Sequence, residues 1–168
     1  MKLWQYAVII TLLQVSSFPL LASPASLGKA PMPPASPAVA LSGDVKLVRV
    51  RSVGGVKTEE QVEPKVVVPG DTLVFSTRYR NEGALPVTDF VVTNPIPAAV
   101  MLAPQDTERR VISVDGGKTW GFLEQFQVDD GKGGSRPATS ADVTHTRWKL
   151  ALIEPGATGV LSYKAIVR

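Results

Sequence analysis

Apolar and polar residues alternate along residues 72–80, which read Thr-Leu-Val-Phe-Ser-Thr-Arg-Tyr-Arg. Successive side chains of a β-strand point to opposite faces, so a period of two predicts a strand with one buried face. The expected inner face holds Leu73, Phe75, Thr77 and Tyr79, and the outer face holds Val74, Ser76, Arg78 and Arg80. This pattern predicts a β-sandwich and no catalytic machinery.

The same alternation recurs in short segments along most of the chain. Further strands are predicted at residues 44–53, 56–62, 88–93, 111–114, 143–152 and 158–167. In the first of them, Val48 and Val50 share a face opposite Arg49 and Arg51. In the segment 143–152, the inner residues are Trp148, Leu150 and Leu152, and the outer residues are His145, Arg147 and Lys149. Many short strands with glycine and proline between them are typical of an all-β sandwich.

Turn-forming residues separate the predicted strands. Gly54-Gly55 can adopt positive φ and predicts a tight hairpin between the first two strands. Other corners are expected at Pro69-Gly70-Asp71, Asn81-Glu82-Gly83, Asn94-Pro95-Ile96-Pro97, Asp115-Gly116-Gly117-Lys118 and Pro155-Gly156. Glycine permits backbone that strains other residues, and Asp or Asn side chains accept hydrogen bonds from turn N–H groups. We therefore expect Gly70 and Gly83 to hold strained backbone, and Asp71, Asn81 and Asn94 to bind turn amides.

The first 42 residues differ from the rest in composition. Lys2 precedes an apolar core at residues 7–15, and Ser23 and Ala25 suit the −3 and −1 positions of a signal-peptidase site. Residues 1–25 are therefore interpreted as a secretory signal peptide, with an uncleaved N-terminal anchor as the alternative. Residues 26–42 form a Pro/Ala/Ser-rich linker, and residues 43–168 form the β-sandwich domain. No stable membrane span is expected after signal removal.

Charge and cysteine content narrow the possible functions. The formal charge of +3 becomes +2 without Lys2, and the basic residues alternate with apolar ones along strands. This arrangement argues against nucleic-acid binding. The chain has no cysteine, which excludes a lipoprotein anchor and a disulfide framework. Stability must then come from the burial of apolar surface.

Residues for catalysis or metal binding are sparse. His145 is the only histidine and lies on the predicted outer face, so it is interpreted as an exposed strand residue, although a trio with Ser140 and Asp142 can be written. Zinc lacks ligands. The loops at residues 115–117 and 129–134 carry aspartates, but their spacing is not that of a calcium loop. We predict no enzyme activity, no metal and no cofactor, and a mobile surface loop at residues 129–142.

Two aromatic residues could contact a ligand. Trp120 and Phe122 flank Gly121 after a predicted hairpin and would share one face of a regular strand. Core packing is the ordinary role of such rings in a sandwich. Exposed, contiguous rings would instead favour a carbohydrate-binding or enzyme-accessory domain. Both readings remain open at this level.

The ordered set of turns and strands resembles a known module. The motif residues are Pro69, Gly70, Asp71, Asn81, Gly83, Asn94, Pro95, Pro97, Pro155 and Gly156, together with Phe75, Tyr79, Val91, Val92 and Trp148. As a set they resemble the DUF11 family, the conserved repeat domains of bacterial secreted and cell-surface proteins. Asn94 stands where that family usually has aspartate, and only one copy occurs here.

The resemblance implies an immunoglobulin-like fold, an exported location in the periplasm, at the cell surface or outside the cell, and no known catalysis. We therefore expect a non-enzymatic envelope module with a structural or protein-interaction role. Its partner would be a protein or another cell-surface component. A free edge strand near the Gly54-Gly55 hairpin could pair with a strand of that partner.

Overall fold

The computed structural model describes residues 38–108 and 110–168. The predicted signal peptide and most of the predicted linker lie outside the described residues. The described chain is mostly β, with antiparallel sheets packed together, as a β-sandwich requires. Within these residues, no helix combines the length and apolar character needed to cross a membrane.

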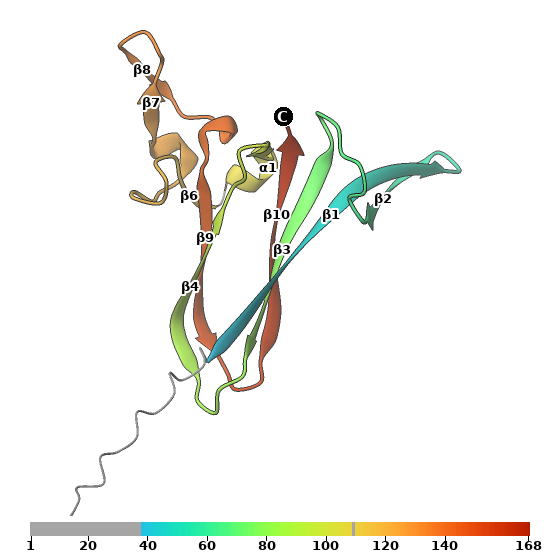
Figure 1. Ribbon diagram of the computed structural model, residues 1–168, viewed down its shortest axis with the longest axis vertical. Coiled ribbons are helices and arrows are strands. Elements are labelled where there is room, and N and C mark those ends of the chain that lie inside the picture. The colour runs from blue at the N-terminus through green and yellow to red at the C-terminus, as the bar shows by residue number, and fades with distance from the viewer. Residues whose placement is uncertain (1–37, 109) are drawn as a thin grey trace, which may run out of the picture. The chain divides into compact units, whose positions relative to one another are not determined.

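The larger sheet has five strands in the order β2-β1-β3-β10-β5 (Figure 1). Their bounds are β1 Val39–Val53, β2 Val56–Val62, β3 Thr72–Asn81, β10 Thr158–Val167 and β5 Val100–Leu102. All four strand pairs are antiparallel, and β3 lies at the centre of the sheet between β1 and β10. The strand β2 pairs only with β1 and forms one edge.

The smaller sheet has three strands in the order β4-β9-β6. Their bounds are β4 Val87–Pro95, β9 His145–Ile153 and β6 Val111–Ser113. The chain changes sheet from β3 to β4, from β4 to β5, from β5 to β6 and from β9 to β10, so the two sheets are interlocked rather than being separate hairpins. Short elements complete the fold: α1 Pro104–Thr107, η1 Leu123–Gln125, β7 Gln127–Asp129, β8 Ser135–Pro137 and η2 Ser140–Asp142.

The core lies between the two sheets and centres on Tyr163. Its ring stacks on Phe75 with ring centroids 5.0 Å apart, and Trp148 of the smaller sheet packs on it at 6.2 Å. Stacked aromatic rings combine large buried area with favourable ring geometry. The other fully enclosed apolar members of this cluster include Leu47, Leu102, Ile112 and Ala165. Burial raises the pKa of the Tyr163 hydroxyl to about 12.

Several predicted turns are confirmed. Val53 pairs with Val56 across Gly54-Gly55, whose φ values of 59° and 82° suit the type I′ turns of two-residue hairpins. The corner before β3 places Gly70 at φ 91°, a conformation that favours glycine. The predicted inner face of β3 is also confirmed, since Leu73 and Thr77 are buried and Phe75 stacks in the core. Val74, which was predicted on the outer face, is buried as well.

Burial departs from the sequence patterns on two strands. Within residues 44–53 the buried side chain is Leu47, which shares the face of Arg49 and Arg51 and lies opposite Leu73 in the pair with β3. On β9, Leu152 is 53% exposed while Ile153 is 1% exposed. The partner strand β4 has Asp89 at φ 52°, and its pairing with β9 is interrupted at this residue, between the pairs Thr88–Leu152 and Phe90–Leu150.

Two predicted boundaries also differ from the structure. β1 begins at Val39, so the sheet takes up the last residues assigned to the linker. The expected loop at residues 129–142 contains the β7–β8 hairpin and the turn η2 instead. Asp130 organises that hairpin by accepting hydrogen bonds from the N–H groups of Lys132 and Gly134.

Candidate interaction surfaces

The corner at Pro69-Gly70-Asp71 has a structural function. The Asp71 carboxylate accepts a 2.9 Å hydrogen bond from the Val68 N–H, as predicted. The same corner holds the last strand, because the Gly70 N–H donates to the Val167 carbonyl and the Val167 N–H donates to the Asp71 carbonyl, each at 2.9 Å. These bonds close the backbone of the corner against β10 and involve no ligand.

Asn81 is a fully buried amide at the end of β3. Its Nδ2 donates to the carbonyls of Leu85 and Ile153, both at 2.9 Å, and its Oδ1 accepts from the Gly83 N–H, as predicted for a turn amide. The bond to Ile153 joins the two sheets. Gly83 does not adopt positive φ, so the prediction of strained backbone is wrong there. An added Cβ would lie 3.2 Å from both Ala38 Cβ and Asn81 Oδ1, so the close approach of these atoms favours glycine.

The corner that follows β4 differs from its prediction at one position. Asn94 does not bind a turn amide; its Nδ2 donates to Thr77 Oγ1 at 2.7 Å and links β4 with β3 across the two sheets. Ile96 is buried in the core. The Pro95 carbonyl accepts a 3.4 Å hydrogen bond from the Tyr163 hydroxyl. Near the opposite end of the sheets, Pro155-Gly156 forms the predicted turn between β9 and β10, and the Gly156 N–H donates to the Asn81 carbonyl.

The trio of Ser140, Asp142 and His145 does not assemble. Asp142 accepts hydrogen bonds from both terminal nitrogens of Arg136, at 2.7 and 2.8 Å, and this guanidinium holds the pKa of the carboxyl well below its usual range. His145 Nδ1 lies 3.2 Å from Thr144 Oγ1 instead. Asp142, which would have to orient His145 in a catalytic triad, is therefore bound to Arg136 instead.

The aspartates of the loops at residues 115–117 and 129–134 accept hydrogen bonds from residues close to them in the chain. Asp115 accepts hydrogen bonds from Ser113, from Thr119 and from the Lys118 N–H, which lower the pKa of its carboxyl well below the usual range. Asp129 accepts from the Gly131 N–H at 2.6 Å. Among the described residues, no group of three or more His, Cys, Asp or Glu side chains is placed to hold a metal ion.

Trp120 and Phe122 lie outside any regular strand. Gly121 between them makes one isolated bridge to Ile112, and the turn η1 follows directly. The Arg147 guanidinium lies over the Trp120 ring, 4.4 Å from the ring centroid. The Trp120 Nε1–H donates a hydrogen bond to the Gly117 carbonyl. Phe122 is 40% exposed. One ring is thus engaged by neighbouring side chains, and the other is accessible.

The far half of the first hairpin is the largest exposed element. We call residues 49–61, which comprise the end of β1, the Gly54-Gly55 turn and most of β2, the arm. Every residue of the arm is exposed, including Val50 at 62%, Val53 at 72% and Val56 at 67%. Figure 1 shows the arm extending to one side of the other strands of the larger sheet.

Ion pairs stiffen the arm and tie its base to the sheet. Arg51 pairs with Glu60 across the hairpin at 2.8 Å, and Lys164 of β10 pairs with Glu59 at 2.7 Å. Lys46 also pairs with Glu63 just beyond β2. Exposed pairs contribute little stability individually, but they favour one position of the arm. Among the described residues, no strand pairs with the outer edge of β2, which leaves its backbone N–H and C=O groups available.

Sequence reasoning predicted this hairpin but not its separation from the core. The available signal was in β2, where Lys57 and Glu59 place charge on one face of the strand and Glu60 places charge on the other. Comparison with family models, with curated proteins and with solved structures gives no match.

Proposed function

We propose that this chain is a non-enzymatic, exported envelope module that contacts a protein or another cell-surface component through the arm. The observation that carries the proposal is a regular hairpin whose arm residues are all exposed and whose β2 edge is paired with no other strand in residues 38–108 and 110–168. Ordering a segment costs conformational entropy, which burial normally offsets. Because the arm buries no apolar residue in the core, contact with a partner is a physical reason for its regular structure.

The mode of contact that fits this edge is strand addition. An extended segment of the partner would hydrogen-bond with the free N–H and C=O groups of β2 and enlarge the sheet. The exposed valines of the arm would supply apolar contact around those bonds. The N-terminal signal peptide and the finer assignment to an immunoglobulin-like sandwich belong to the same proposal; interlocked antiparallel sheets of five and three strands support the latter.

A photo-crosslinking amino acid placed at Thr58 on β2 tests the proposal in the cells that export the protein. We expect a specific crosslinked product from Thr58 and none from the matched position Leu85, which is exposed outside the regular strands. Equal products from both positions, or none from Thr58, would contradict contact through the arm.

A shortened variant separates contact from folding. This variant lacks residues 50–53 and 56–59, so that Arg49 and Glu60 directly flank the Gly54-Gly55 turn. The deletion removes four strand pairs, and an even number keeps the remaining side chains on their original faces. We expect this variant to unfold cooperatively near the wild-type temperature and to give no envelope crosslink from a probe at Gln61. Loss of the folded state would show that the arm is part of the structural core.

A carbohydrate-binding or enzyme-accessory role remains the second proposal, supported by the accessible Phe122 ring. Stacking on sugars needs exposed ring faces, and Arg147 covers one face of the Trp120 ring. The double variant Trp120→Ala, Phe122→Ala, compared with wild type in a glycan-binding screen, tests this role. Binding that the variant loses while it stays folded would support it, and unchanged or absent binding would remove it.

A further inference from the structure

A groove of about 480 Å³ lies over the larger sheet, at the end opposite the arm. On the outer face the register places two rows of its lining residues: Ala40, Arg80 and Thr158 stand opposite one another, and so do Ser42, Arg78 and Val160. The row between them, Leu41, Tyr79 and Gly159, also lines the groove and directs its side chains to the other face. Residues directly opposite on antiparallel strands share a face, with Cβ atoms about 5 Å apart. The outer face is the one turned away from Leu73 and Phe75, and so away from the core.

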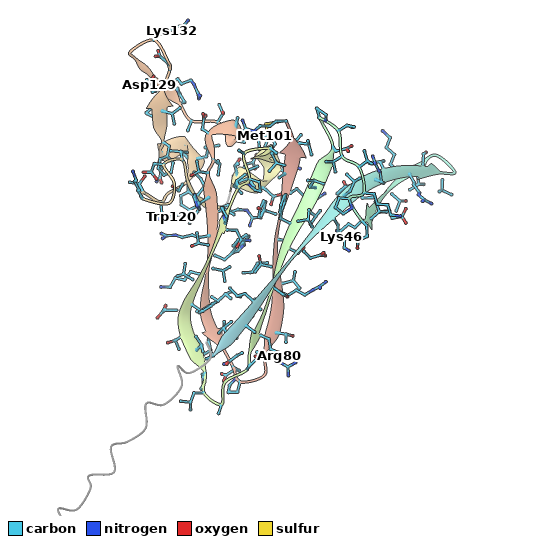
Figure 2. All side chains as sticks on the ribbon, viewed as in Figure 1. Lys46, Arg80, Met101, Trp120, Asp129 and Lys132 are labelled. Carbon is cyan, nitrogen blue, oxygen red and sulfur yellow. The ribbon has the colours of Figure 1, made fainter. Side chains whose placement is uncertain are left out.

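Two arginines give the groove its charge. Among the described residues, neither the Arg78 nor the Arg80 side chain has a carboxylate oxygen within 4 Å, whereas the arginines of the arm and of the loops near β9 take part in ion pairs. Asp44, one row further along β1, lies 3.8 Å from the Lys46 ammonium. Figure 2 shows Arg80 near the end of the sheet where β9 turns into β10.

The spacing of the charges is set by the strand. Arg78 and Arg80 are two residues apart on β3, which places their Cα atoms about 6.8 Å apart on one face. Glu82 continues the same parity just after the strand and also lines the groove. The exposed face therefore presents two positive charges followed by a negative one at strand spacing.

An extended peptide has the same repeat. Carboxylates at positions i and i+2 of an extended segment lie on one side, also about 6.8 Å apart. A guanidinium holds a carboxylate through two parallel hydrogen bonds, and this geometry favours arginine over lysine at such a site. Val160, which is 59% exposed, and Ala40 give apolar contact beside the charged rows.

We infer that the groove over β1, β3 and β10 binds an extended acidic segment of a partner protein, with two carboxylates spaced two residues apart on Arg78 and Arg80. This inference goes beyond the contact proposed for the arm, because it concerns another face and another chemistry. A partner could engage both surfaces, but neither depends on the other.

The test is an NMR titration of the full-length, ¹⁵N-labelled chain with two peptides of identical composition. One is acetyl-Gly-Ser-Asp-Thr-Asp-Ser-Gly-amide, and the other is acetyl-Gly-Ser-Asp-Asp-Thr-Ser-Gly-amide, whose adjacent acids point to opposite sides when extended. We expect the first peptide to shift the amide signals of residues 78–80 and 158–160. It should bind at least about threefold more tightly than the second peptide, because the second peptide can place only one of its two carboxylates on an arginine of the groove. Raising the ionic strength should weaken the binding.

The matched variants reverse two charges each. Arg78→Glu with Arg80→Glu should weaken binding of the first peptide by about tenfold or more, because attraction becomes repulsion at both positions. Lys57→Glu with Lys65→Glu makes the same change of net charge at exposed positions outside the groove and should leave the affinity within about twofold. Circular dichroism confirms that both variants are folded.

Three results would overturn the inference: equal affinity for the two peptides, equal weakening by the two double variants, or shifts outside the groove. Inorganic polyphosphate that shifts the same residues while both peptides do not would show a general anion site instead. The shortened-arm variant should bind the first peptide unchanged. A failure of the arm to crosslink would therefore contradict the proposed function without altering this result.

Discussion

The centre of the larger sheet and the arm are built from the same kind of antiparallel ladder, yet they differ in what surrounds it. β3 is paired on both sides and buries Leu73, Val74 and Thr77. The arm is paired internally, exposes both faces and leaves one edge free. A net intramolecular hydrogen bond contributes only about 1 kcal/mol to stability. The hydrogen-bond ladder of the arm therefore holds it less firmly than the ladder and the burial of apolar side chains together hold the centre.

The difference indicates two separate tasks within one sheet. The centre stabilises the module, and it carries the aromatic stack between Phe75 and Tyr163. The arm takes its shape from the Gly54-Gly55 turn and from ion pairs such as Arg51–Glu60. Substitutions should therefore affect stability in the centre and partner contact in the arm.

The largest expected effect comes from emptying the core. Leu102 is fully buried, so Leu102→Ala should reduce the free energy of unfolding by about 2–5 kcal/mol through lost burial and the cavity left behind. Val50→Ala in the arm also removes methyl groups, but it should change stability by no more than about 0.5 kcal/mol. Urea unfolding of both variants measures the contrast, and similar losses from the two would contradict the division of tasks.

A second effect is expected at the end of β3. Asn81→Ala leaves the buried Ile153 carbonyl without its side-chain donor and the Gly83 N–H without its acceptor, which should cost about 1–3 kcal/mol. Asn94→Ala is a suitable comparison, because Asn94 is only half-buried and makes one hydrogen bond, to Thr77. Thermal unfolding should rank Asn81→Ala as the more destabilised variant; the reverse order would show that the link between β4 and β3 is the stronger one.

Alkaline pH should destabilise the centre through Tyr163. Its hydroxyl has a pKa of about 12 in the folded protein and about 10 in the unfolded chain, so the unfolded state loses its proton first. The stability that this group contributes is fully present below pH 10 and is lost as the pH rises through 12, by about 2 kcal/mol at pH 12.

The substitution Tyr163→Phe identifies the group responsible, because it keeps the ring beside Phe75 and removes the titrating hydroxyl. Denaturant unfolding between pH 9 and pH 12 should show a shallower decline for this variant than for wild type. Identical declines would mean that the lysines, which also titrate in this range, account for the whole effect.

Local chemistry predicted much of the fold. Gly54-Gly55 marks a hairpin because two adjacent residues must take positive φ, and Asp71 and Asn81 bind the turn amides that their short polar side chains can reach. The inner face of β3 followed from its period of two. Each of these features depends only on residues close together in the chain.

The features that were missed depend on distant segments. Ile153 rather than Leu152 is buried where the pairing of β4 with β9 is interrupted at Asp89, and Asn94 binds Thr77 because the two sheets approach there. Val160 lies beside Arg78 and Arg80 in the groove because β3 pairs with β10 in this register. A single strand pattern carries no information on such pairings.

Native-state hydrogen exchange of the full-length protein tests the separation of arm and centre most directly. We predict that β3 amides exchange only through global unfolding, since β3 is paired on both sides, whereas the alternate β2 amides that point away from β1 exchange nearly as fast as unstructured chain. Outward β2 amides protected as strongly as the β3 amides in the isolated protein would show that the β2 edge is covered, and would contradict a free arm.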